Sequence, residues 1–117
     1  MIKTFEQHTE DLNAQELGMV PMLVDVLSKR VGKKNAVSSE EIQRFLAIQP
    51  RRLRKIVNHI RNRSLIEGLL ASGKGYYIST DRQEIEDYIE SLEGRESAIR
   101  TVREGMEAYL RRLDNKV

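Results

Sequence analysis

Cysteine and tryptophan are absent from this chain of 117 residues, and histidine occurs only twice. Without cysteine, neither a disulfide bond nor a thiolate metal site can form. No apolar run approaches the roughly 20 residues that a membrane-spanning helix needs, and the N-terminal residues show no signal-peptide pattern. We therefore expect a soluble, cytoplasmic protein. The two isolated histidines, His8 and His59, predict no zinc site, and nothing in the sequence indicates another cofactor.

Charged residues are nearly balanced in number, with 20 Lys and Arg against 18 Asp and Glu, but they are unevenly distributed. The segment 42–66 contains seven basic residues and no acid, whereas the segment 81–96 contains seven acids and two arginines. This asymmetry predicts a basic working surface next to an acidic supporting element.

A capping pattern locates the first helix. Asn13, followed three residues later by Glu16, is the pattern of a capping box at a helix N-terminus. Apolar residues then recur at helical spacing: Leu17, Val20, Val24, Leu27 and Val31. Pro21 either kinks this helix or marks a later start at its first helical position.

Two further helices follow, joined by about three residues. The residues 36–37 are compatible with a short edge strand, and Ser38 with Glu41 forms a second capping box that opens a short helix. Its expected inner face consists of Ile42, Phe45 and Leu46. Pro50 suits the first position of a third helix, which we expect to run to about Arg63. Such a pair, with a basic second helix, is the helix-turn-helix pattern.

The stretch GLLASGKG, from Gly68 to Gly75, comes within one residue of the phosphate loop G-x-x-x-x-G-K-[ST] of nucleotide hydrolases. That loop uses its final hydroxyl to hold a magnesium ion and must open a helix. Gly75 has no hydroxyl, and the following residues 76–80 favour a strand. The stretch therefore predicts a hairpin in which Gly73 and Gly75 supply positive φ angles and Lys74 stands at the tip. We expect no nucleotide as ligand.

The third helix has two contrasting faces. Leu53, Ile56, Val57 and Ile60 converge on the face that must be buried. On the opposite face we expect Arg51, Lys55, Asn58 and Asn62 along the centre, with Arg52 and His59 on one flank and Arg54 and Arg61 on the other. Arg and Lys can donate to guanine edges, Asn can pair with adenine, and flanking arginines suit phosphates. An ordinary solvated helix mixes both signs of charge, so the absence of acids favours contact with nucleic acid.

The first helix, the helix pair and the hairpin LIEGLLASGKGYYIS together resemble a winged helix domain, with the hairpin as the wing. The phrases KGYYIS and LEGRESAI also resemble those of small bacterial and phage winged helix proteins. The resemblance covers about the first 80 residues. It implies that the third helix enters the major groove through the face described above, and that Lys74 contacts phosphate. The turn AIQP departs from the family pattern because it lacks the glycine common in such turns.

The C-terminal segment predicts one long helix with an apolar seam of alternating three- and four-residue spacing. The seam consists of Ile85, Tyr88, Leu92, Ile99, Val102, Met106, Tyr109 and Leu113. Arg95 fills its one vacant place, and Asp81 can cap the helix. Because such a helix would overhang a domain of this size, a second copy of the chain is the simplest partner for the seam. The alternative is a break at Gly94, with the remainder folding back on the first helix.

These patterns predict a mainly α protein with a small β-hairpin (α+β): an N-terminal arm (1–12), a winged helix DNA-binding domain (13–80) and a long C-terminal dimerisation helix (81–117). The expected function is sequence-dependent binding of double-stranded DNA by a homodimer, as a transcriptional regulator or a phage or mobile-element factor. The alternative is a protein-interaction module whose basic face docks an acidic partner. No catalytic motif predicts an enzyme. Replacing Lys55 with glutamate is expected to weaken duplex binding with folding intact.

Overall fold

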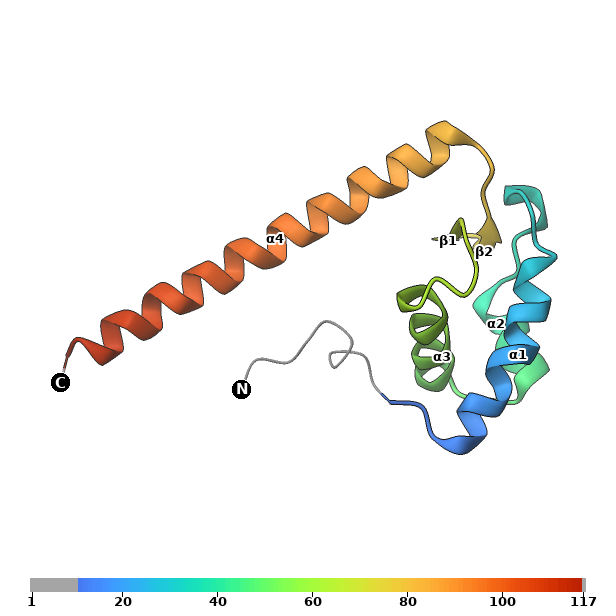
Figure 1. Ribbon diagram of the computed structural model, residues 1–117, viewed down its shortest axis with the longest axis horizontal. Helices are drawn as coiled ribbons and strands as arrows, with labels where there is room; N and C mark the ends of the chain where they lie inside the picture. The colour runs from blue at the N-terminus through green and yellow to red at the C-terminus, as the bar shows by residue number, and fades with distance from the viewer. Residues whose placement is uncertain (1–10, 117) are drawn as a thin grey trace. The chain divides into compact units, whose positions relative to one another are not determined.

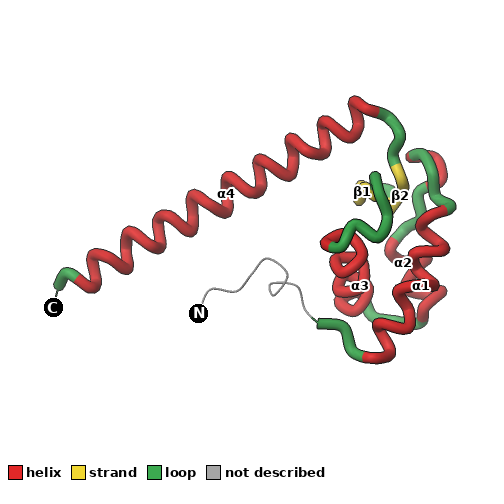
Figure 2. The backbone as a smooth tube through the Cα atoms, in the orientation of Figure 1, coloured by secondary structure: helices red, strands yellow, loops and turns green. Residues whose placement is uncertain are grey.

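The computed structural model describes residues 11–116 (Figure 1), so that only Asp11 and Leu12 of the expected N-terminal arm are included. The chain divides into two compact units, the first ending at Thr80 and the second beginning at Asp81. Unit 1 contains α1 (Ala14–Ser28), the 3-10 helix η2 (Lys33–Asn35), α2 (Ser39–Leu46), α3 (Pro50–Asn62), β1 (Leu69–Ser72) and β2 (Gly75–Ile78), and unit 2 contains α4 (Arg82–Asp114). The described part is mainly helical with one two-stranded hairpin, as the sequence predicted (Figure 2).

The start of α1 confirms the capping box. The backbone N–H of Glu16 donates to Oδ1 of Asn13 at 2.8 Å, and the backbone N–H of Asn13 donates to Oε1 of Glu16 at 3.0 Å. Pro21 lies inside the helix, so the later start is wrong.

The buried face of α1 differs from the expected stripe. Leu23 and Leu27 are fully buried, whereas Leu17 is about half exposed because the inward position in the first turn is taken by Glu16. Val31 lies beyond the helix end and forms a parallel bridge with Ile78. Several apolar residues in this segment fit helical spacing, and periodicity alone does not show which of them face the core.

In α2, the Ser38 cap is confirmed, but the capping box is incomplete because Oε1 of Glu41 accepts from Oγ of Ser38 at 3.3 Å. One of the expected core residues is also wrong. The backbone N–H of Glu41 donates to Oγ of Ser38 at 3.2 Å. Ile42 and Leu46 are buried, but Phe45 is 60% exposed. Ile48, in the following turn, is buried instead. A helix of eight residues offers a narrow inner face, and residues four apart fill it.

The turn between α2 and α3 adopts the left-handed conformation without glycine. Ala47 has φ 53° and ψ 49°, and the backbone N–H of Ile48 donates to the carbonyl of Gln43 at 3.1 Å. This conformation costs an alanine roughly 1–2 kcal/mol. It allows Ile48 to reach the core and Pro50 to begin α3.

The hairpin pairs Leu69 with Ile78 and Ser72 with Gly75, so that residues 73–74 form the turn. The backbone N–H of Lys74 donates to Oγ of Ser72, which donates to the carbonyl of Gly75. This strand-turn-strand arrangement is the expected one. A phosphate loop must be followed directly by a helix, and this turn is followed by a strand.

The glycine roles in the hairpin were predicted only in part. Positive φ occurs at Gly75 (121°) but not at Gly73, and a further positive φ occurs at Gly68. The edge strand expected at 36–37 is a single antiparallel bridge between Val37 and Tyr76.

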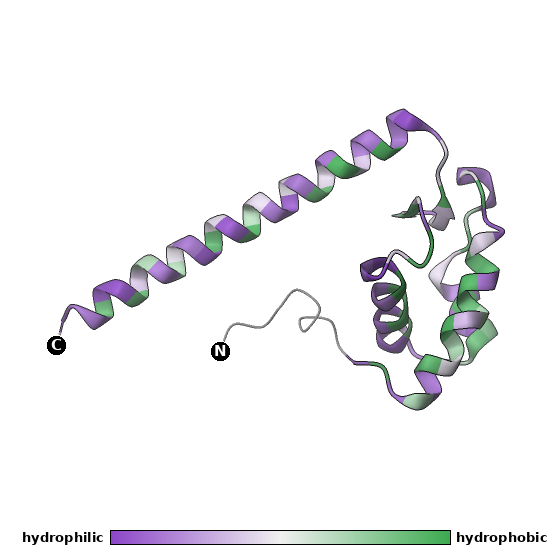
Figure 3. Ribbon diagram, viewed as in Figure 1, coloured by the Kyte–Doolittle hydropathy of each residue, from purple (hydrophilic) through white to green (hydrophobic). Residues whose placement is uncertain are grey.

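One core joins the helices of unit 1 to the hairpin. Its buried residues are Leu23, Leu27, Val37, Ile42, Leu46, Ile48, Leu53, Ile56, Val57, Ile60, Ile66 and Leu69. Figure 3 shows that the apolar side of α3 faces α1 and α2, while its other side is hydrophilic. The core therefore fixes which face of α3 is presented to solvent.

The helix α4 is continuous over 33 residues, so the alternative of a break at Gly94 is wrong. Asp81 caps it by accepting from the backbone N–H groups of Gln83 and Glu84. None of its residues is buried. Within the described range, no helix combines the length and apolar character needed to cross a membrane.

Candidate nucleic-acid interface

The apolar face of α3 is the one the sequence predicted. Leu53, Ile56, Val57 and Ile60 are all at most 2% exposed. Pro50 occupies the first turn, and no acidic residue occurs in the first turn of the helix. The remaining positions determine the surface that α3 offers to a partner.

Two of the expected contact residues are engaged with α1. Nζ of Lys55 lies 3.1 Å from Oε1 of Glu16, and Nε of Arg52 lies 3.1 Å from its Oε2. Nη2 of Arg52 also donates to Oε1 of Gln15 at 2.8 Å. The Glu16 side chain is only 1% exposed and that of Lys55 only 21%. Lys55 therefore does not lie at the centre of the exposed face. Contrary to the expectation from sequence, we expect Lys55→Glu to disturb folding, because the new carboxylate would face Glu16.

Glu16 remains ionised in this position. The hydrogen bond from the backbone of Asn13, together with Lys55 and Arg52, lowers the pKa of Glu16 from 4.5 to about 2, against the opposing effect of burial. The carboxylate thus anchors the start of α3 to the start of α1. The sequence assigned Glu16 only to the capping box, and its second role depends on residues 36 and 39 positions away.

The Glu16 ion pairs predict a specific dependence of stability on pH. A depressed carboxyl pKa stabilises the folded state above pH 4.5, and this contribution is lost as the pH falls towards about 2. Glu16→Gln should therefore melt at a lower temperature than the native chain at pH 6, and the difference should shrink between pH 4.5 and 2. Thermal denaturation across this pH range measures the difference in melting temperature. A difference that stays constant with pH would contradict the role given to the Glu16 ion pairs.

The exposed stripe of α3 consists of residues spaced three and four apart: Arg51, Arg54, Asn58 and Asn62. Arg61 and His59 are half-buried at its edges. Burial and the neighbouring Arg63 both lower the pKa of His59, which favours the neutral imidazole. Relative to the predicted face, the centre has moved from Lys55 towards Arg54.

Lys74 is exposed at the hairpin turn, as expected. Its backbone is held by Ser72, which leaves the side chain at the tip of the strand pair. His8 lies outside the described residues.

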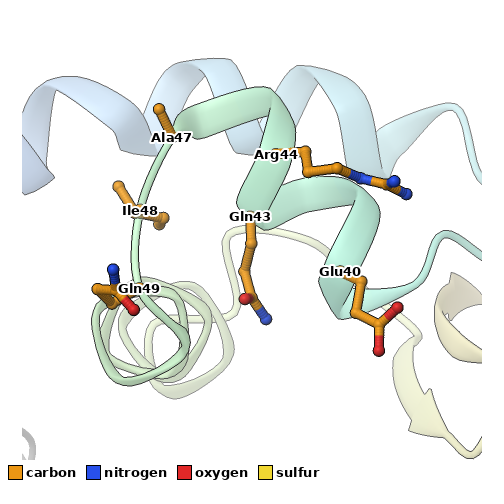
Figure 4. A pocket seen from close by; sticks show the side chains of 6 residues that line it. All are labelled: Glu40, Gln43, Arg44, Ala47, Ile48 and Gln49. Atoms are coloured by element: carbon orange, nitrogen blue, oxygen red, sulfur yellow. The ribbon is translucent and has the colours of Figure 1, made fainter.

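An open hollow of about 410 Å³ lies beside α2 and the turn that follows it (Figure 4). It is lined by Glu40, Gln43, Arg44, Ala47, Ile48 and Gln49. Four of these six residues are polar, and Glu40 is the one carboxylate among them. Among residues 11–116, no three His, Cys, Asp or Glu side chains are grouped so as to hold a metal ion.

Comparisons of the chain with protein-family models, with curated proteins and with solved structures found no match. The interpretation of the site therefore depends on the geometry of this chain.

Proposed function

We propose that the protein binds double-stranded DNA through the exposed stripe of α3, with unit 1 acting as a winged helix domain and α4 joining two copies. The observation that carries this proposal is the exposed stripe itself. Two arginines and two asparagines occupy it, and no acid occurs anywhere in the segment 42–66.

The dimensions of α3 suit a groove. A helix of 13 residues is about 20 Å long, and the major groove of B-DNA, about 12 Å wide, admits an α-helix. Arg51 and Arg54 can donate to guanine or phosphate, and Asn58 and Asn62 can make the paired hydrogen bonds that adenine accepts and donates. The stripe thus combines groups for positioning with groups for base recognition.

The ion pairs beneath the stripe support the same role. Glu16 holds Arg52 and Lys55 against α1 and so fixes the rotation of α3 about its axis. Two cations facing one carboxylate keep a net positive charge there, which attracts phosphate. Lys74 at the hairpin tip adds a separate positive group for a neighbouring stretch of backbone.

This function places the protein in the cytoplasm with the DNA, where we propose that it acts as a transcriptional regulator or as a phage or mobile-element binding factor. Binding and steric exclusion are then the mechanism, and no catalytic step is involved.

The proposal is tested by incubating the full chain with a pool of random duplexes at physiological salt and sequencing the bound fraction. We expect enrichment of a defined sequence that occurs as two related half-sites. Duplex capture without enrichment would contradict base recognition, and the absence of capture would favour docking of an acidic protein on the same stripe.

A further inference from the structure

The face of α4 that carries the apolar seam is uncovered. Six of the eight seam residues are between 41% and 69% exposed: Leu92, Ile99, Val102, Met106, Tyr109 and Leu113. Ile89 and Leu110, which the predicted seam omitted, are also about half exposed and lie one position after Tyr88 and Tyr109. A second helix along this face would cover nine seam positions, which are those of the eight seam residues and Arg95.

The charge along α4 favours an antiparallel partner of the same sequence. The first half, 82–96, carries six acids and two arginines, whereas the second half, 97–114, carries four arginines and three acids. A parallel pair would set the two acidic halves against each other. An antiparallel pair sets each acidic half against the more basic half of the other copy.

Arg95 gives an independent argument for the same orientation. It fills the one seam position that is not apolar. In a parallel pair in register, Arg95 would face Arg95 of the second copy inside the seam, with no carboxylate between them. In an antiparallel pair it faces an apolar side chain, along which its stem can pack while the guanidinium reaches water.

One antiparallel register satisfies the flanking positions as well. It pairs Ile99 with Val102 of the second copy, Arg95 with Met106, Leu92 with Tyr109 and Tyr88 with Leu113. On one flank this register sets Glu96 near Arg103 and Ile89 near Leu110. On the other flank it sets Ala98 near Gly105, where the small side chains permit close approach.

Neighbouring registers, one heptad away in either direction, are unfavourable. A shift in one direction sets Glu96 against Glu96 of the second copy, and a shift in the other sets Arg103 against Arg103. Within the chain, Glu96 pairs with Arg100 and Arg103 pairs with Glu107. Both pairs are exposed, so they can extend into a network with the second copy at little cost.

We propose that α4 forms an antiparallel two-helix pair with the α4 of a second copy, in the register that sets Ile99 against Val102. This inference rests on the dimeric part of the proposed function and does not depend on DNA binding.

Because the chain has no cysteine, introduced cysteines report the register directly. Full-length Leu92→Cys and Tyr109→Cys chains are mixed and mildly oxidised, and covalent dimers are identified by mass spectrometry. We expect a disulfide joining positions 92 and 109 in the mixture and none in either variant alone, where like positions stand about 25 Å apart along the pair. The matched control mixes Glu90→Cys with Arg111→Cys. In the proposed register these two positions are level with each other along the helix axis but face away from the seam, so they should not cross-link.

Three results would overturn the proposal. Efficient cross-linking of Leu92→Cys with itself would indicate a parallel pair. Preferential cross-linking of Leu92→Cys with Val102→Cys would indicate a different register. A chain without introduced cysteine that sediments as a monomer at high concentration would exclude pairing and, with it, the dimeric part of the proposed function. Duplex binding by the same sample, measured separately, would show whether unit 1 still recognises DNA.

Discussion

Gly75→Ala is expected to unfold unit 1 under conditions in which the native chain is stable. A Cβ at this position would lie 2.1 Å from the carbonyl oxygen of Val37 and 2.8 Å from Cα of Ser38, which are backbone atoms of the segment paired with β2. Gly75 also has φ 121°, a region essentially restricted to glycine. The backbone strain at residue 75 and the forced displacement of the 37–38 backbone should together lower the free energy of unfolding by roughly 3–5 kcal/mol.

Gly73→Ala is the matched control for this prediction. It lies two residues away in the turn of the same hairpin, and a Cβ there would meet nothing within 4 Å. We expect its stability to remain within about 1 kcal/mol of the native value. Urea denaturation followed through the NMR signals of buried methyl groups, such as those of Leu23 and Ile56, separates unit 1 from the signal of α4. Equal midpoints for the two variants would show that the Val37 contact does not constrain the hairpin.

Arg54→Glu is expected to reduce duplex affinity by roughly 10- to 100-fold, the range of 1–3 kcal/mol for loss of a direct contact. Arg54 lies at the centre of the exposed stripe, so the substitution places an acid against phosphate or a base edge while the core of unit 1 is retained. The slope of affinity against salt concentration should also become shallower by about one counterion or more.

Lys34→Glu makes the same change of charge on an exposed residue of η2, beyond the C-terminal end of α1. Because Arg52 contacts the first turn of α1, the start of α3 lies at the other end of that helix from η2. Fluorescence anisotropy with the duplex enriched from the random pool should show less than a threefold loss for this control, since only the overall field changes. Equal losses for both variants would mean that net charge, and not the exposed stripe, governs binding.

Local signals in the sequence were sufficient for most of the fold. Asn13, Ser38 and Asp81 cap the helices where their side chains predicted, and Pro50 begins α3. These features depend on residues within three or four positions of each other. The spacing of the α4 seam likewise predicted one long helix.

The errors and omissions of the sequence-based prediction concern residues whose role depends on distant parts of the chain. Glu16 was predicted as a cap, but its burial depends on Arg52 and Lys55. Gly75 needs its conformation because Val37 approaches its backbone, a contact that the turn sequence does not contain. Phe45 is exposed, whereas Ile48, which follows the left-handed Ala47, is buried. DNA binding and dimer formation stay predictions.

The absence of any buried residue in α4 links its folding to the abundance of the protein. A helix that gains no packing within its own chain depends on association for most of its stability, so its helicity should follow mass action. For the proposed dimer, a low concentration of the chain would give single units with a frayed α4 and weak binding to a DNA site made of two half-sites. At higher concentration the proposed pairing would order α4, and two linked units would then bind the proposed DNA sites with avidity, without any new contact to DNA. The DNA affinity of the chain would thus depend on its own concentration. The length of α4 would set the concentration at which pairing begins.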